Sequence, residues 1–308
     1  MKFKTWISKR WICLDYGFIL PILARLPMRW GRFLASLRGM LYAKVQRDWR
    51  QFSFNDTSLH ERTCEAFEKI VPGIERHKLE HIIRDRYRMQ SLEEFDAACL
   101  VRNTITRWPV VFDGLEAVEE AAKTGQGIVF LTAHFGTSIV GGPFLRRLGL
   151  PILGMSSDIV DHPQVDPNIS RFFQLKYQAM GNDLNGGTIL HRQGNTRRFL
   201  RILQQGGAVV IVGDLPPDPG EEAIFKPFFG ENRGFSPGAV KMAAMTKSLL
   251  FAYVCEFIEG QYVIRFSKPG EDVYGFIESA IKNNPCAWWA ADLLPLLPLE
   301  SPVDVTLK

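Results

Sequence analysis

The chain has 308 residues, of which 46% are hydrophobic and 23% are charged, which is typical of a globular protein and excludes a disordered one. Its five cysteines are scattered without a metal-ligand spacing, so they predict reduced thiols and exclude both a disulfide framework and a zinc site. The net charge of +4 is uneven, because residues 1–50 hold eleven Lys and Arg against Asp15 and Asp48, a net charge of +9.

This basic segment is also rich in aromatic and aliphatic residues. Its tryptophans are Trp6, Trp11, Trp30 and Trp49. Charged residues and a proline interrupt the apolar run 12–26, which is too short for a spanning helix, and no signal-peptide cleavage site follows it. Such a composition is typical of a helix lying on an anionic membrane surface, and the alternative is a cationic helical face packed on the rest of the fold. No nucleic-acid-binding motif accompanies the charge, so we expect no nucleic-acid partner.

Residues 1–110 are predicted to be mostly helical. Apolar residues recur at helical spacing over 59–70 and 79–100, and Pro72-Gly73 separates the two runs. The charged residues of the second run predict a solvated face; they are Arg84, Arg86, Arg88, Glu93 and Glu94. Pro109 ends this region, so we expect a mostly helical N-terminal region over residues 1–110 and a second domain over residues 111–308.

The second domain alternates helices and strands. Strands are predicted over 110–112, 127–132, 151–155, 208–212, 249–257 and 262–266, with a turn at Gly260 joining the last two. Helices are predicted over 115–123, 139–148, 171–180, 195–205, 238–247 and 274–283, and the residues after 292 are expected to be irregular. This alternation predicts an α/β fold with a mixed, mostly parallel sheet flanked by helices.

Two polar residues directly follow predicted core strands. His134 comes after the strand 127–132, and Asp214 comes after the strand 208–212. If these strands are parallel neighbours, both side chains open on the sheet edge where α/β proteins bind their ligands. His134 can then act as a general base, with a structural histidine as the alternative. Asp214 can orient the histidine, bind a polar substrate group or close its loop as an Asx turn.

Three other patterns are excluded as sites. Gly234-Phe-Ser-Pro-Gly238 matches the nucleophile elbow of hydrolases, but that elbow needs the backbone N–H that Pro237 lacks. We therefore predict that Ser236 caps a helix that begins at Pro237. The acidic loop 158–166 has no recognisable ligand spacing, so we expect no metal. Gly125 and Gly127 precede their strand, so they form no dinucleotide fingerprint, and we expect no cofactor.

Several blocks, in order, resemble the bacterial lipid A biosynthesis (late) acyltransferases of the lysophospholipid acyltransferase superfamily. The blocks are Gly114-Leu-Glu116, Thr132-Ala-His-Phe-Gly136, Gln205-Gly-Gly-Ala-Val-Val-Ile-Val-Gly-Asp214 and Lys226-Pro-Phe-Phe-Gly230, followed by a helix near Ser236. The basic, aromatic start of the chain resembles the membrane-associated start of that family. The resemblance implies a peripheral or shallowly anchored protein on the cytoplasmic face of the bacterial inner membrane, acting in lipid A and lipopolysaccharide biosynthesis.

The resemblance implies transfer of a fatty acyl group from an acyl carrier protein or acyl-CoA thioester to a hydroxyl of a lipid or glycolipid acceptor. His134 matches the family's catalytic histidine, but Ile139 stands where the family has a carboxylate. The chain also has Asp214-Leu215 where the family has Asp-Gln, and Trp288-Trp289 where the family's C-terminal aromatic segment runs into basic residues. Asp214 is therefore the remaining candidate for the carboxylate partner of His134.

Four further residues are candidates for substrate binding. Lys226 and Arg233 carry the positive charge that an anionic substrate group requires. Phe135 and Phe229 are candidates for the wall of an acyl slot, with core packing as the alternative. Because Ile139 removes a family carboxylate, a second hypothesis is a catalytically silent homologue that binds acyl chains or an acyl carrier protein as a partner subunit.

Overall fold

A seven-stranded sheet forms the centre of the computed structural model, which describes residues 10–105 and 108–300. The strand order is β1-β9-β8-β2-β5-β3-β4. The bounds are Val110–Asp113 (β1), Ile128–Thr132 (β2), Ile152–Ser156 (β3), Thr188–His191 (β4), Ala208–Val212 (β5), Leu249–Ile258 (β8) and Gln261–Phe266 (β9). Within this sheet of described residues, the pair β8–β9 is antiparallel and the other neighbours are parallel. The predicted mixed, mostly parallel sheet is confirmed.

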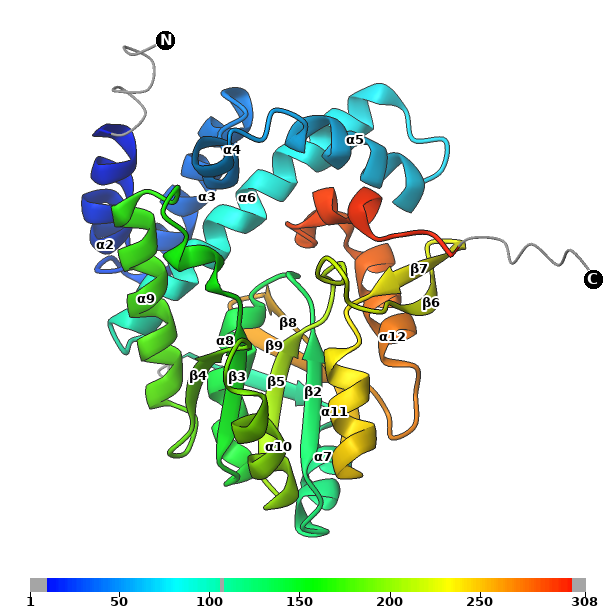
Figure 1. Ribbon diagram of the computed structural model, residues 1–308. Helices are drawn as coiled ribbons and strands as arrows, with labels where there is room; N and C mark the ends of the chain where they lie inside the picture. The colour runs from blue at the N-terminus through cyan, green and yellow to red at the C-terminus, as the bar shows by residue number, and fades with distance from the viewer. Residues whose placement is uncertain (1–9, 106–107, 301–308) are drawn as a thin grey trace, which may run out of the picture.

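Helices cover the sheet, and a further layer of helices lies beyond its carboxyl edge. The domain helices are α7 (Leu115–Lys123), α8 (Ser138–Phe144), α9 (Pro167–Asn182), α10 (Thr196–Gln204), α11 (Gly238–Thr246) and α12 (Val273–Asn283). The earlier helices are the π-helix Asp15–Ile19, α2 (Leu20–Leu23), α3 (Met28–Lys44), α4 (Trp49–Phe54), α5 (Leu59–Ile70) and α6 (Arg76–Val101). These earlier helices, blue to cyan in Figure 1, form the additional layer. No helix within the described ranges has the length and apolar character needed to cross a membrane.

Some element boundaries differ from the predicted ones for local reasons. The prediction that Ser236 caps α11 is wrong: the helix begins at Gly238, and the Ser236 hydroxyl donates to Glu221 instead. The short strand β4 and the hairpin β6 (Ile224–Phe228) and β7 (Glu231–Phe235) were not predicted. β4 is a four-residue strand at the edge of the sheet, β6 contains a proline, and β7 begins with three polar residues, so none has the long apolar run that identifies a core strand.

The prediction of a solvated face on the second helix is wrong for Arg86, Glu93 and Glu94 of α6, which are buried. Glu93, Glu94 and Asp96 are buried there, and each has a cationic partner on another helix. The pairs are Glu93 with Lys176 of α9, Glu94 with Arg38 of α3, and Asp96 with Arg32 of α3. A buried charge is tolerated when it is paired, and these partners are remote in sequence, so the local pattern did not reveal them.

The apolar core continues across residue 110. One cluster contains Tyr16 and Phe95 together with Tyr262 and Phe266 of the sheet. The N-terminal helices therefore share their packing with the α/β part. The division into two units at residue 110 stays a prediction.

Candidate active site

The β2–α8 turn fixes the position of His134. Gly136 in this turn has a φ of 56°, and a Cβ there would lie 2.3 Å from the carbonyl oxygen of Cys255. Only glycine combines this backbone conformation with such a close approach to strand β8. The turn thus holds the histidine backbone at the carboxyl end of β2.

Asp214 holds both the ring and the backbone of His134. Strands β2 and β5 are parallel neighbours with Thr132 opposite Val212, so the residues that follow them meet at one sheet edge. His134 Nδ1 lies 2.9 Å from Asp214 Oδ1, and the His134 backbone N–H donates to Asp214 Oδ2, also at 2.9 Å. The structure therefore brings together the two residues that the sequence analysis singled out.

Asp214 is an ionised acceptor in this arrangement. Its carboxylate is buried, and Oδ2 also accepts a hydrogen bond from Trp288 Nε1 at 2.7 Å. Burial would raise the pKa of Asp214, but the charge and hydrogen bonds of His134, together with Trp288, outweigh burial and lower the pKa. Since an ionised carboxylate can only accept hydrogen bonds, Nδ1 of His134 carries a proton and donates a hydrogen bond to Asp214. In the neutral imidazole, Nε2 is then the basic nitrogen.

The C-terminal segment supports the pair from a distant part of the chain. The Trp289 N–H donates to the carbonyl of His134 at 3.1 Å, and the two rings meet edge to face with centroids 4.8 Å apart. Arg86 of α6 donates from Nε to the Trp289 carbonyl at 2.6 Å and forms ion pairs with Asp48 and Asp292. From the sequence, the tryptophan pair was only a departure from the family pattern, because no local signal connects residues 288 and 289 with residue 134.

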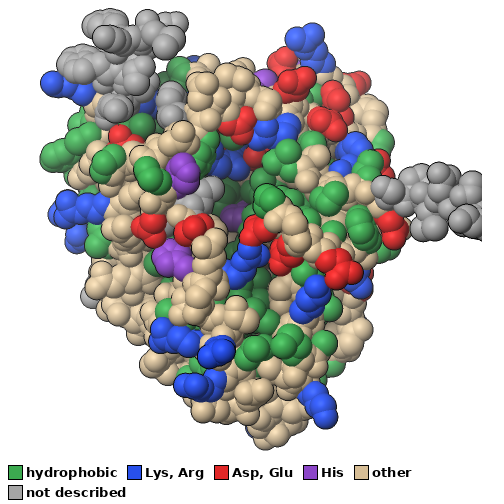
Figure 2. All heavy atoms as spheres, viewed as in Figure 1, with side chains coloured by type: hydrophobic (Ala, Val, Ile, Leu, Met, Phe, Trp, Pro, Cys, Tyr) green, Lys and Arg blue, Asp and Glu red, His purple; other side chains and the backbone are tan. Residues whose placement is uncertain are grey.

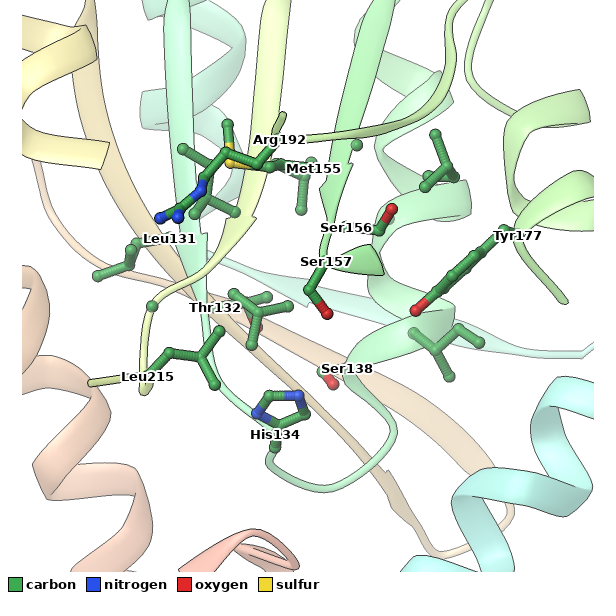
Figure 3. Close-up of a pocket in the computed structure, with 18 of the residues that line it drawn as sticks. Leu131, Thr132, His134, Ser138, Met155, Ser156, Ser157, Tyr177, Arg192 and Leu215 are labelled. Atoms are coloured by element: carbon green, nitrogen blue, oxygen red, sulfur yellow. The ribbon is translucent and has the colours of Figure 1, made fainter. Parts of the chain in front are cut away.

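A cavity of about 280 Å³ opens beside the histidine ring. One part of its wall is apolar and includes Leu131, Met155, Met180, Leu184, Ile189 and Ile211. The His134 side chain is 26% exposed, and its ring faces this space (Figure 3). Figure 2 shows a hollow in the middle of this face of the protein, with apolar and histidine side chains in it. The cavity therefore combines an apolar wall with one basic nitrogen.

Ile139 lies in the same wall. This residue is 5% exposed, and it contributes to the cavity lining from the first turn of α8. An apolar side chain thus occupies the position where the family resemblance leads one to expect a carboxylate. The carboxylate that binds the histidine comes from the end of β5 instead.

The structure places the four predicted substrate-binding residues outside the cavity lining. Lys226 lies on β6, partly buried, and Arg233 on β7 is buried, with its guanidinium donating to the carbonyls of Leu294 and Leu297. Phe135 is fully buried, and Phe229 stacks on the ring of Trp288. Arg233 and Phe229 thus contact the C-terminal segment, which no spacing in the sequence indicates.

The lining contains polar residues that the sequence analysis did not identify. They are Glu93 of α6, Lys176 and Tyr177 of α9, Ser138 of α8, Ser157 after β3 and Arg192 after β4. These six residues come from five different segments, and none belongs to a recognisable motif. Only the folded arrangement places them around one space.

Comparison with known proteins gives two matches. The family model described as bacterial lipid A biosynthesis acyltransferase matches residues 2–288. The lipid A biosynthesis acyltransferase of Haemophilus influenzae is 26% identical over 142 residues, which cover 45% of this chain and 40% of that protein. The matched stretch therefore spans less than half of this relative's length.

Proposed function

The chain belongs to the bacterial lipid A biosynthesis acyltransferase family, and from this premise we propose that it transfers a fatty acyl group from a thioester to an acceptor hydroxyl. The donor is an acyl carrier protein or coenzyme A thioester, and the acceptor is a glycolipid or related lipid. The observation that carries this proposal is the His134–Asp214 pair beside a cavity with an apolar wall. The wall suits an acyl chain, and the pair supplies a base at its edge.

The geometry supports a base-catalysed acyl transfer. Nε2 of His134 accepts the proton of the acceptor hydroxyl as the hydroxyl oxygen bonds to the thioester carbonyl carbon. The tetrahedral intermediate then expels the thiolate, which takes the proton from Nε2. Asp214 keeps Nδ1 protonated and stabilises the imidazolium without taking the proton itself.

The same pair favours an enzyme over a silent homologue. Ile139 leaves α8 without a carboxylate for the imidazole, but the buried carboxylate of Asp214 binds Nδ1 directly. A protein that only bound acyl chains would need neither an ionised carboxylate in that position nor a partly exposed imidazole beside the cavity. The role of the family carboxylate is thus proposed to pass to Asp214.

Restoring the family carboxylate is expected not to help. In Ile139→Glu the Nδ1 proton is already donated to Asp214, and Nε2 must stay free for the acceptor, so the new carboxylate has no productive partner. It also places a charge in a buried apolar wall, which should lower the free energy of unfolding by roughly 1–3 kcal/mol. Transfer rates and thermal unfolding of Ile139→Glu should be compared with Ile139→Val as the size control. A faster Ile139→Glu enzyme would show that Asp214 does not fill this role.

We also propose that the N-terminal helices lie on a membrane surface. Large apolar side chains are exposed at helical spacing in two stretches of this region. Leu14, Phe18 and Ile22 lie on the stretch that includes the π-helix Asp15–Ile19 and α2, and Trp30, Phe33, Leu37 and Leu41 lie on α3. Apolar and cationic side chains lie together along the left edge of the view in Figure 2. This supports peripheral attachment, with the cytoplasmic face of the inner membrane as the proposed location.

The positive charge of this region is only partly available to lipids. Arg32, Arg38 and Arg50 are engaged in ion pairs with Asp96, Glu94 and Asp292 of later elements. Exposed cations remain at Arg25, Arg29 and Lys44. We therefore expect insertion of the apolar side chains to contribute more to membrane attachment than the net charge of +9 would suggest, because part of that charge is already paired.

Exposed aromatic residues provide the test of membrane binding. The partition coefficient of the variant Phe18→Ala/Trp30→Ala/Phe33→Ala for anionic vesicles should fall at least about tenfold, since burying one large apolar side chain contributes about 1.5–3 kcal/mol. Co-sedimentation measures this, with Met245→Ala as control, because Met245 is exposed on the remote helix α11. Unchanged partitioning of the triple variant would contradict the proposed surface.

A further inference from the structure

Three hydroxyl groups face the space in front of His134. Ser138, Ser157 and Tyr177 come from α8, the end of β3 and α9, and their oxygens point toward the cavity in Figure 3. Within the described residues none of these hydroxyls has a hydrogen-bond partner, although each lines the cavity. Burial, together with the charges of Glu93 and Asp161, raises the pKa of Tyr177, so its hydroxyl keeps its proton and can donate.

The cations of the lining are already neutralised. Lys176 Nζ lies 2.6 Å from Glu93 Oε1, and both side chains are buried. Arg192 forms ion pairs with Asp218 and, at 3.4 Å, with Glu221. Asp158 adds a further carboxylate to the lining. The described wall thus presents two cations against the three carboxylates of Glu93, Asp158 and Asp218, and a phosphate here would lose water without gaining a free cation.

The three unpartnered hydroxyls and the paired cations together define the chemical groups that the acceptor can carry near its reacting hydroxyl. Building on the proposed function, we propose that an uncharged, hydroxyl-bearing lipid head enters the cavity, where Ser138, Ser157 and Tyr177 bind its hydroxyls while His134 deprotonates one of them. An acceptor with a phosphate beside the reacting hydroxyl is rejected. The cavity therefore differs in character from one that selects a phosphorylated sugar or glycerol.

Binding to the full chain tests this selectivity without requiring turnover. A monoacylglycerol and the lysophosphatidic acid with the same acyl chain differ only by the phosphate, and calorimetry in neutral detergent micelles compares their affinities. We expect the monoacylglycerol to bind at least about tenfold more tightly. Equal or tighter binding of the lysophosphatidic acid would overturn the proposal.

Single-hydroxyl variants identify the groups involved. Tyr177→Phe should weaken monoacylglycerol binding about two- to tenfold, which is the loss expected for one hydrogen bond. Tyr274→Phe is the matched control, because the Tyr274 hydroxyl is buried without a partner on α12, outside the cavity. Ser157→Ala, near the surface, gives a second variant with little risk to folding. Equal affinities of both cavity variants and the control would refute the role of the hydroxyls.

Releasing a lining cation should change the preference in the opposite direction. Asp218→Asn removes one of the two carboxylates beside Arg192, so we expect lysophosphatidic acid to bind about two- to fivefold more tightly. No gain would contradict the charge argument. Selective binding without acyl transfer to any acceptor would support this inference and count against the proposed function, so the two can fail separately.

Discussion

His134→Ala should abolish measurable acyl transfer while leaving the fold intact. The imidazole supplies the basic nitrogen at the cavity edge, and a positioned general base typically contributes about 10²–10⁴-fold to the rate. Its side chain is 26% exposed, so truncation leaves space that water can fill and removes little packing. The ring contact with Trp289 is lost, but the hydrogen bonds of the His134 backbone to Asp214 and Trp289 remain available.

The measurement is turnover of a long-chain acyl carrier protein or acyl-CoA thioester with a lipid acceptor. Thermal unfolding of the same preparations shows whether the variant is folded. His81→Ala serves as the matched control, because His81 is an exposed histidine on α6 that pairs with Asp85 and not with any cavity residue. Full activity of His134→Ala would assign the histidine to structure and remove the basis of the proposed mechanism.

The central strands and the His134–Asp214 pair could be predicted from the sequence because each depends on short-range signals. Strands β2 and β5 are continuous apolar runs, and His134 and Asp214 are the polar residues that follow them. One topological assumption, that the runs are parallel neighbours, was enough to place both residues on one edge. The observed register, with Thr132 opposite Val212, fulfils that assumption.

The roles of Arg86 and Arg233 in holding the C-terminal segment could not be predicted from the sequence, because their partners are far away in the chain. Arg86 reads as a surface residue in its helix, yet its side chain is fully buried and holds the carbonyl of Trp289 across more than half of the sequence. Arg233 reads as a free cation, but its donors satisfy carbonyl oxygens of the C-terminal segment. A run of charged residues predicts solvent exposure only where no distant segment supplies an opposite charge or a carbonyl oxygen as a partner. The local sequence does not show which distant segments pack there.

Asp214→Asn is expected to be nearly as damaging as His134→Ala. An asparagine side chain can donate from its amide to Nδ1, which then becomes the acceptor and leaves the proton on Nε2. That tautomer has no lone pair facing the acceptor hydroxyl, so it cannot serve as the base. In the best-studied catalytic triad, the corresponding Asp-to-Asn change lowers kcat about 10⁴-fold.

The fold should tolerate this change, because asparagine keeps the shape of aspartate and its carbonyl oxygen can still accept from Trp288 Nε1. Asp113→Asn is the control: it makes the same chemical change at an exposed residue that ends strand β1, away from the cavity. Transfer rates, thermal unfolding and acyl-chain binding should be measured for both variants.

The double variant His134→Ala/Asp214→Asn separates an enzyme from a silent homologue. If the two residues act as one unit, the double variant should be little slower than either single variant, since removing the base already removes what the carboxylate supports. If the chain is instead a binding subunit without catalysis, the wild-type chain shows no acyl transfer. Both single variants and the double variant then retain acyl-chain binding. A folded Asp214→Asn protein with full activity would refute the pair. It would also leave the histidine without a carboxylate partner, because Ile139 supplies none. Of the other acids of the lining, Glu93 and Asp218 are already paired with Lys176 and Arg192, and Asp158 is exposed on the segment after β3.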